Sequence, residues 1–512
     1  MASENAFFMA SVVDADGDIT ADERDALHRL VALWDARLEH NRLRRDFFEM
    51  HVNVKNVGIA LSDEMVRKLE VACGWPKKAV TMPSERSRID GWVFESGTQS
   101  GDLLRIMRDN NFTAKYDMAA QSELTHGLMC WTLSRADVGR SKVRIKTHSA
   151  ETSAVEWDGT SERVKDGIAI VGSRPLWGKS YTTVPCAVNL YTDDATVVLT
   201  LDDDNVHWHA KRASNPMGRP LIEPMVYSPT VTRPLGQSRI TRAVMGIVMS
   251  KLRNDMRSEI AAETFTTPQK FLLGATDDAF DMDRYEAYMG NIFLAGKDED
   301  GDVPQFGQLP QGSMQPLVDY GRSLAAQFAG ETSIPITSLG IIHDQPASAE
   351  AMESAERDMV QLVERMNQTN GNALRNVALM ALAIDDGPGR SLDSLDEDEY
   401  GVHVRWADPA MPNKAAQADA WTKLASVAPW VSETDEFLAG FGVPEEMRFS
   451  MLAQKRRIEG RNLTFGGIGG NDTEGAAQPL QLGARGGEGG GGEQVVDGIV
   501  PPAGQGNGGL VS

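Results

Sequence analysis

Apolar residues recur at helical spacing in four long stretches of this chain, and each stretch predicts an amphipathic helix. The first runs from Asp22 to about Met50, and the second covers residues 238–264. The third covers residues 315–331, and the fourth runs from about residue 348 to about residue 382. The positions that define the second and the fourth are Ile240, Val244, Ile247, Val248, Leu252, Met256 and Ile260, and Met352, Ala355, Met359, Val363, Met366, Leu374 and Val377. We therefore expect a mainly helical chain.

Between the first and second helices the pattern changes to short runs of alternating apolar and polar residues. Residues 128–210 contain runs such as AVNLYTDD and TVVLTLDDD, which are rich in β-branched residues and separated by Gly, Asp, Asn and Ser. This pattern is typical of half-buried antiparallel strands. It predicts an antiparallel meander packed on helices, and hence an α+β fold class. Upstream, MPSERSRIDGWVFES predicts a loop that enters a strand at Trp92–Glu95.

The region between the second and third helices predicts a compact insert. Within residues 269–314, the segments QKFLLG and NIFLAG have the composition of short strands. Helices on both sides of a small insert predict a helical hairpin that carries the insert at its tip.

A loop rich in helix-breaking residues precedes the fourth helix. Residues 332–347 contain Pro335 and Pro346, which lack a backbone donor, and Gly340 lies between them. After this loop, Ser348 is suited to cap a helix, and Glu350 falls in the first turn, where negative charge is favourable. Nothing here resembles a catalytic site, so we expect the loop and the helix to have a mechanical role.

Near the N-terminus, the segment DADGDITADE allows two interpretations. Alternating aspartates from Asp14 to Asp18 resemble a calcium-binding loop, but such a loop closes with a glutamate at position twelve. Here Glu23 stands at position ten. Thr20 with Glu23 instead matches a helix capping box. The sequence therefore favours a helix cap over a calcium site.

Two further patterns resemble cofactor sites. The segment GIAIVGSRPLWGKSYT resembles a phosphate-binding loop, but five residues instead of four separate Gly172 from Gly178, and a strand pattern follows. The acidic residues 202–204 precede His207 and His209, which alternate on a strand and would share one face. A metal site needs further ligands, and a polar hairpin is the commoner case. We therefore expect no ATP, no metal and no cofactor.

Composition narrows the function classes. Of 512 residues, 41% are hydrophobic, which is enough to build cores, and the net charge of −22 argues against a general nucleic-acid-binding protein. Three widely spaced cysteines indicate no disulfide framework and fit a reducing compartment. The first residues lack the basic region of a secretory signal. No apolar run approaches the roughly 18–20 residues that would span a bilayer.

The order and spacing of the segments resemble a portal protein of long-tailed double-stranded DNA bacteriophages, in the branch common in phages of actinobacteria. The resemblance is carried by RPLGQSRITRAV, FTTPQKFLLG and GETSIPITSLGIIHDQPASAEAMESAERDM, and it covers most of residues 20–385. No segment is a chemical motif. The resemblance implies a ring, usually of twelve subunits, at one vertex of the capsid, with a central channel through which DNA enters and leaves.

The resemblance also divides the chain into the parts of a portal. These are the wing (1–230), the first stem helix (231–267), the clip (268–314), the second stem helix (315–331), the tunnel loop (332–347), the long wing and tunnel helix (348–385), a linker with a strand (386–411), the crown helices (412–461) and a glycine-rich tail (462–512). The composition of the tail predicts disorder.

DNA-facing candidates follow from the same resemblance. In the tunnel loop they are Ser333, Ile334, Pro335, Thr337, Ser338, Gly340, His343, Asp344 and Gln345, with Ser348 and Glu350 at the start of the following helix. On the first stem helix they are Lys251, Arg253 and Arg257, which are equally well interpreted as solvated charges or subunit salt bridges. An acidic chain suits a channel that must pass DNA without binding it tightly.

The implied function is a virion structural protein without catalysis, a head–tail connector used in packaging and ejection of the viral genome. The implied partners are other copies of the chain, DNA that is not read by sequence, the large terminase subunit, a head-completion or adaptor protein, and the major capsid and scaffold proteins. No membrane is implied, and assembly would take place in the host cytoplasm. Two alternatives are an ATP-dependent packaging motor, which the glycine spacing weakens, and another capsid or scaffold protein. Ring stoichiometry and channel-lining side chains stay open.

Overall fold

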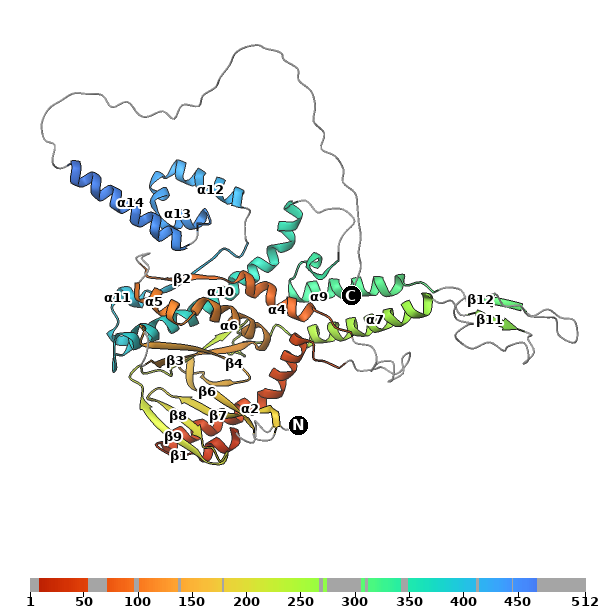
Figure 1. Ribbon diagram of the computed structural model, residues 1–512, viewed down its shortest axis with the longest axis horizontal. Coiled ribbons are helices and arrows are strands. Elements are labelled where there is room, and N and C mark those ends of the chain that lie inside the picture. The colour runs from red at the N-terminus through yellow and green to blue at the C-terminus, as the bar shows by residue number, and fades with distance from the viewer. Residues whose placement is uncertain are drawn as a thin grey trace, which may run out of the picture. The chain divides into compact units, whose positions relative to one another are not determined.

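The computed structural model describes residues 9–53, 71–95, 101–136, 140–176, 179–266, 270–273, 305–308, 312–341, 349–410, 414–443 and 445–466. The chain divides into two compact units, Met1–Pro412 and Asn413–Ser512. The first unit contains two main sheets and most of the long helices (Figure 1). The mixed content of helix and strand confirms the expected α+β class.

The β-rich region forms two sheets instead of one meander. A six-stranded sheet has the order β1-β9-β8-β7-β6-β5, and a three-stranded sheet has the order β10-β3-β4. The strands are β1 (Asp16–Gly17), β3 (Leu128–Arg135), β4 (Val143–Ser149), β5 (Ser153–Asp158), β6 (Arg163–Leu176), β7 (Lys179–Tyr191), β8 (Ala195–Leu201), β9 (Trp208–Ser214) and β10 (Ile222–Val226). All pairs in these two sheets are antiparallel except β1 with β9, which are parallel. The expected antiparallel pairing is therefore confirmed, but the number of sheets was not predicted.

The first long helix, α2 (Ala21–Glu49), begins at the expected cap. The Thr20 hydroxyl accepts a hydrogen bond from the amide of Glu23 at 3.2 Å, and the Glu23 carboxylate accepts one from the amide of Thr20 at 2.8 Å. These reciprocal bonds satisfy donors that the first helical turn leaves free. The segment with the alternating aspartates contributes Asp16 to β1. The capping-box prediction is therefore confirmed.

Both cofactor-like patterns lie in hairpins of the six-stranded sheet. Gly172 lies inside β6, which pairs with β7 as an antiparallel hairpin, so no glycine loop leads into a helix here. His207 lies 2.5 Å from a carboxylate oxygen of Asp204, and His209 lies 2.9 Å from one of Asp202. Among the described residues no group of three or more His, Cys, Asp or Glu is placed to hold a metal ion. The histidines therefore serve as polar partners within their hairpin.

One predicted loop is wrong, because residues 82–86 are the last turns of helix α4 (Trp75–Arg86). Proline has no backbone donor, so Pro83 leaves the carbonyl of Ala79 without its usual helical partner. That carbonyl instead accepts a hydrogen bond from Nε of Arg239 at 2.5 Å. The helix therefore continues through the proline because a side chain from a distant segment replaces the missing donor.

The predicted helices at residues 238–264, 315–331 and 348–382 are confirmed apart from their exact ends. The expected strand near Trp92 is β2 (Ile89–Val93), which pairs with β13 (His403–Trp406). The remaining helices of the first unit are α5 (Gly101–Asp109), α6 (Phe112–His126), α7 (Arg242–Thr266), α9 (Gln315–Thr332), α10 (Ala349–Asp386) and α11 (Glu397–Tyr400), with 3-10 turns η1 (Val12–Asp14), η3 (Ile336–Leu339) and η4 (Leu392–Ser394). In the insert, β11 (Lys270–Leu273) pairs with β12 (Gln305–Gln308), whereas NIFLAG lies outside the described residues.

Helix α10 lies at the centre of the largest core of the first unit. Nearly every side chain between Ala373 and Ile384 is buried, and these side chains share one cluster with α4, α6 and the three-stranded sheet. The stacked rings of Phe112 and Trp131, with centroids 4.9 Å apart, lie in the same cluster. A helix that is apolar all round belongs inside a protein. A second core lies between α2 and the six-stranded sheet.

The second unit is helical. It contains α12 (Lys414–Val427), η5 (Pro429–Glu433), α13 (Asp435–Gly440) and α14 (Glu445–Gly466). Two of these helices fall in the segments where the sequence predicts crown helices, whereas α13 was not predicted. Within the described ranges, the search for a helix with the length and apolarity needed to cross a bilayer gave no candidate.

Candidate functional site

The candidate site is the helix pair α7–α9 with the connector that follows it, residues 333–341. The two helices lie side by side and carry the β11–β12 hairpin at their far end (Figure 1). Asn254 of α7 donates a hydrogen bond to the carbonyl of Leu317 at 3.1 Å, and Thr241 donates one to the Glu331 carboxylate at 3.2 Å. Because the early part of α7 contacts the late part of α9, the pair is antiparallel.

Each helix of the pair buries one apolar stripe. On α7 the side chains of Val244, Val248 and Leu252 are fully buried, and on α9 Leu324 and Phe328 are buried. The stripe on α7 is the one predicted from the 3.6-residue period. Val318 and Tyr320, near the start of α9, lie at the two edges of its buried stripe and are 44% and 43% exposed. The pair therefore buries one stripe in its own copy and leaves apolar groups beside that stripe exposed.

The three basic candidates on α7 differ in the partners of their side chains. Nζ of Lys251 lies 2.5 Å from the Asp255 carboxylate and 5.4 Å from the ring centre of Trp75. Arg253 donates a hydrogen bond to the Ser250 hydroxyl at 3.1 Å. Arg257 is exposed, and no carboxylate of the described residues pairs with it. Lys251 is therefore neutralised within its own copy, whereas no carboxylate of the described residues pairs with Arg253 or Arg257.

The connector is anchored in its own copy over its first half. Ile334 is 3% exposed, Leu339 is 8% exposed, and both belong to the main core. Ser333 ends α9 in the left-handed region with φ of 51°, and Gly340 has φ of 86°. Thr337 and Gly340 are exposed.

This burial corrects part of the DNA-facing set. Ile334 and Pro335 are buried by their own copy, so their side chains are not available to DNA. His343, Asp344, Gln345 and Ser348 lie outside the described residues. Glu350 lies in the first turn of α10, with a side chain outside the described part. Ser333, Thr337, Ser338 and Gly340 stay as candidates within the described part.

A buried arginine that sequence reasoning missed fixes the start of the connector. Arg239 donates hydrogen bonds to the carbonyl of Ala79, to that of Thr332 and to the hydroxyl of Tyr227, the last at 2.9 Å. Lys78 of α4 donates one to the carbonyl of Ser338. A buried charge is costly unless it is hydrogen-bonded, so these acceptors hold Arg239 in place. The only available signal was its position in the segment SRITRAV, just before α7.

Helix α10, at the other end of the loop, is held by buried polar contacts. Asn370 donates a hydrogen bond to the Glu123 carboxylate of α6 at 2.8 Å, and Ser87 donates one to the side-chain oxygen of Asn367 at 2.6 Å. Burial raises the pKa of Glu123 to about 8, against the opposing effect of the hydrogen bond from Asn370. Further along, the carboxylate of Asp385 pairs with Arg105 at 2.5 Å.

These contacts anchor the chain before and after residues 342–348. Arg239 holds the start of the connector, and Asn367 and Asn370 hold α10 to the main core. The thiols of Cys73 and Cys130 are buried, which raises their pKa values to about 11 and about 12 and keeps them protonated. Protonated buried thiols are poor nucleophiles and poor metal ligands.

The sequence was compared with known protein families and proteins. Residues 28–436 match the family model described as phage portal protein, SPP1 Gp6-like. The portal protein of Mycobacterium phage L5 is 25% identical over 74% of this chain and 77% of its own length. That of Mycobacterium phage D29 is 24% identical over 79% of this chain and 82% of its own length.

Chains of solved gene transfer agent particles match this chain at low similarity. A chain in the neck of the empty particle, computed with C6 symmetry, has a TM-score of 0.42 and 12% identity, covering 76% of this chain and 94% of that one. A chain in the neck of the native particle, computed with C12 symmetry, has a TM-score of 0.40 and 12% identity, covering 72% and 90%. Because the family model spans most of the sequence, this chain belongs to the SPP1 Gp6-like family of phage portal proteins.

Proposed function

We propose that copies of this chain form a closed ring at one capsid vertex, through which the phage genome is packaged and later ejected. The antiparallel pair α7–α9 is the stem, the insert with β11 and β12 is the clip, and residues 332–347 are the tunnel loop. Residues 1–230 form the wing with α10, and the second unit forms the crown. The chain acts as a conduit and has no catalytic step of its own.

The observation that carries this proposal is the partial exposure of apolar groups on α9. Its buried stripe packs on α7, and Val318 and Tyr320 at the edges of that stripe are 44% and 43% exposed. Apolar groups on a projecting helix are covered when identical helices pack side by side in a head-to-tail ring. The ring would contain twelve copies, as in the related portals that the sequence resembles.

The same parts indicate the partners. At the tip of the stem, the clip is free to bind the head-completion or adaptor protein and the large terminase subunit. The wing would face the major capsid and scaffold proteins. With a net charge of −22 per copy, the ring repels DNA phosphate on average, so DNA passes without strong sequence-independent binding.

The proposal is tested by separating assembly from DNA transport. Deleting residues 342–347 leaves the buried Ile334 and Leu339 of the connector intact. We expect this variant to assemble like the natural chain but to package or retain less DNA when it replaces the portal of its phage. Leu339→Ala, which perturbs the anchored half, serves as the structural control. Normal packaged DNA in the deletion variant would contradict the tunnel-loop assignment.

A further inference from the structure

A pocket of about 1170 Å³ opens between α2, the turn between β5 and β6, and the loop that follows β10. Arg37 and Arg44 of α2 line it, and Arg233 of the loop faces them. Residues 37, 40 and 44 recur at helical spacing, so they lie on one side of α2. We call this site the basic pocket.

The positive charges of the basic pocket have no internal counter-charge. No carboxylate of the described residues lies within 4.0 Å of the guanidinium groups of Arg37, Arg44 or Arg233. Arg44 instead donates hydrogen bonds to the carbonyl of His126 at 3.0 Å and to the side chain of Asn41 at 3.3 Å. Burial, then the like charges of Arg233 and Arg37, lowers the pKa of Arg44. The three cations therefore repel one another in the folded protein, which is electrostatically unfavourable.

Other titratable groups of the pocket do not neutralise this charge. Glu156 lines the pocket but pairs with Arg29 at 3.1 Å, and Glu162 is exposed. His126 is buried, its Nδ1 has no hydrogen-bond partner, and burial with Arg44 and Arg45 lowers its pKa to about 4. The pocket is net positive in a chain whose total charge is −22.

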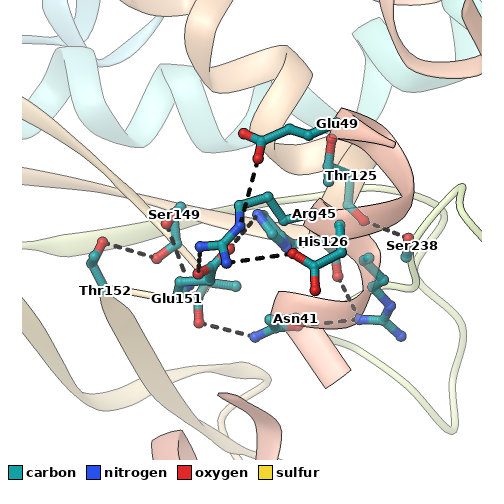
Figure 2. Close-up of polar contacts among 12 residues, drawn as sticks. Asn41, Arg45, Glu49, Thr125, His126, Ser149, Glu151, Thr152 and Ser238 are labelled. Atoms are coloured by element: carbon teal, nitrogen blue, oxygen red, sulfur yellow. Dashed lines mark hydrogen bonds and ion pairs between the residues drawn. The ribbon is translucent and has the colours of Figure 1, made fainter. Parts of the chain in front are cut away.

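The wall of the pocket is rigidly built. The side-chain amide of Asn41 donates a hydrogen bond to the carbonyl of Ala150 at 3.0 Å, and Arg45 pairs with Glu151 at 2.6 Å. Ser238, just after the loop, donates a hydrogen bond to the carbonyl of Thr125. Figure 2 shows these contacts joining α2, the end of α6 and the turn after β4. The arginines are therefore presented on a fixed frame.

The size and lining of the pocket point to a peptide segment as the occupant. The volume of about 1170 Å³ is larger than most small-molecule pockets, which are about 300–1,000 Å³. Leu128, Val155 and Trp157 add apolar walls, and Val231 is fully exposed at the rim. A single small anion would leave these walls uncovered. A protein segment that carries carboxylates is large enough to cover them while pairing with the arginines.

The same chain exposes carboxylates at residues 393–398, which we call the acidic segment. Its one apolar side chain, Leu395, packs against its own core. Asp393, Glu397 and Asp398 are exposed, and none of them pairs with a cation of the described residues. The segment is held in place from behind, because Arg375 donates a hydrogen bond to the carbonyl of Tyr400 at 2.6 Å. In Figure 1, α11, which begins within the segment at Glu397, lies at the edge of the first unit, well apart from α2. One copy therefore cannot place this segment in its own basic pocket.

We propose that the basic pocket receives the acidic segment of a second copy of this chain. The inference rests on the ring assembly proposed above. A head-to-tail interface needs two different, complementary patches on separate parts of each copy, and these two patches meet that requirement. Copies that carry −22 each repel one another, so a local pair of opposite charges would orient their encounter.

Charge reversal on each side tests the proposal. Arg37→Glu with Arg233→Glu forms the pocket variant, since both side chains are exposed and neither has a hydrogen bond or ion pair with another described residue. Asp393→Lys with Asp398→Lys forms the segment variant. Lys165→Glu with Lys211→Glu is the matched control for the pocket variant, because both lysines are exposed on strands outside the pocket. Circular dichroism first confirms that every variant is folded.

Ring formation is then measured by native mass spectrometry over a range of protein and salt concentrations. We expect the concentration needed for half assembly to rise by about tenfold in the pocket variant and in the segment variant, and to recover when the two are combined. The control should assemble like the natural chain.

If the natural chain forms rings and the pocket variant does so equally well, this inference fails while the proposed function stands. Failure of the combined variant to recover would also overturn the inference, because the pocket would then have another occupant. A natural chain that forms no rings would contradict the proposed function itself.

Discussion

Helix α10 and the pair α7–α9 are both long helices, but they bury their apolar side chains in different ways. Between Ala373 and Ile384, α10 is covered on nearly every side by its own copy. The pair buries one stripe and leaves Tyr320 43% exposed. The difference separates two roles, because a helix surrounded by its own core gives stability and a helix covered on one side needs a neighbour.

The polar contacts follow the same division. Along α10 they are buried and reach distant elements, such as the contact of Asn370 with Glu123. On α7 the charged groups pair locally, as Lys251 does with Asp255 one turn away. Buried polar contacts specify one arrangement of a core, whereas local surface pairs contribute little. Four substitutions test this difference between α10 and the pair α7–α9.

The largest effect is expected for Leu374→Ala in α10. The side chain is fully buried, so its removal leaves a cavity in the central core. We expect the free energy of unfolding to fall by about 2–5 kcal/mol, measured by urea denaturation. Val318→Ala on the exposed side of α9 is the control and should change it by less than about 0.5 kcal/mol. Equal small losses at both positions would remove the distinction between the two regions.

The second effect is a change in pH dependence for Glu123→Gln. Because burial raises the pKa of Glu123 to about 8, the folded protein holds a proton that the unfolded chain releases near its ordinary pKa of 4.5. Glu123 therefore lowers stability progressively as the pH rises from about 4.5 to about 8. Glutamine keeps the shape without the charge, so the variant should lose this slope and be relatively more stable at pH 8. Unfolding by urea at several pH values measures it, and an unchanged slope would show that Glu123 ionises freely.

A smaller effect is expected for Lys251→Gln on α7. The substitution removes an ion pair with Asp255 and a contact with the Trp75 ring. Such interactions contribute about 0.5–1 kcal/mol, and high salt should reduce the difference between the variant and the natural chain. Arg257→Gln, at an exposed position without a partner among the described residues, is the control. A larger loss of stability for Arg257→Gln than for Lys251→Gln would contradict the conclusion that Lys251 is the paired charge and Arg257 the unpaired one.

The smallest effect on a single copy is expected for Tyr320→Ala. Since the side chain is partly exposed, the free energy of unfolding of the isolated copy should change by less than about 0.5 kcal/mol. Ring formation, in contrast, should weaken, because the neighbouring copy loses an aromatic contact. Sedimentation velocity at several concentrations separates the two quantities. Normal assembly with a loss of monomer stability would place Tyr320 in the core of its own copy.

Much of the helical framework could be predicted from the sequence. Long amphipathic helices repeat their apolar period many times, so α2, α7, α9 and α10 were identified with small errors at their ends. The order of these helices also identified the family, although no chemical motif was present. The start of α2 was predictable because Thr20 and Glu23 act on each other across a single turn.

The parts that were missed depend on contacts between distant residues. The segment MPSERSRIDGWVFES predicts a loop, but residues 82–86 are helical because Arg239, far along the chain, bonds the carbonyl that Pro83 leaves free. The resemblance places Ile334 in the tunnel loop as a DNA-facing candidate, yet the core of its own copy buries it. The basic pocket could not be predicted from the sequence, since Arg37 and Arg233 are distant in sequence and meet only in the folded chain. Local pattern gives no information on such pairs.

We infer that neighbouring copies in a closed ring cover the exposed apolar groups of α9. Electron microscopy of the purified chain, with its mass measured under native conditions, tests this inference directly. We expect closed rings with a central hole, and fewer of them when Tyr320 is replaced by alanine. A stable monomer at high concentration, or spherical shells in place of rings, would contradict it.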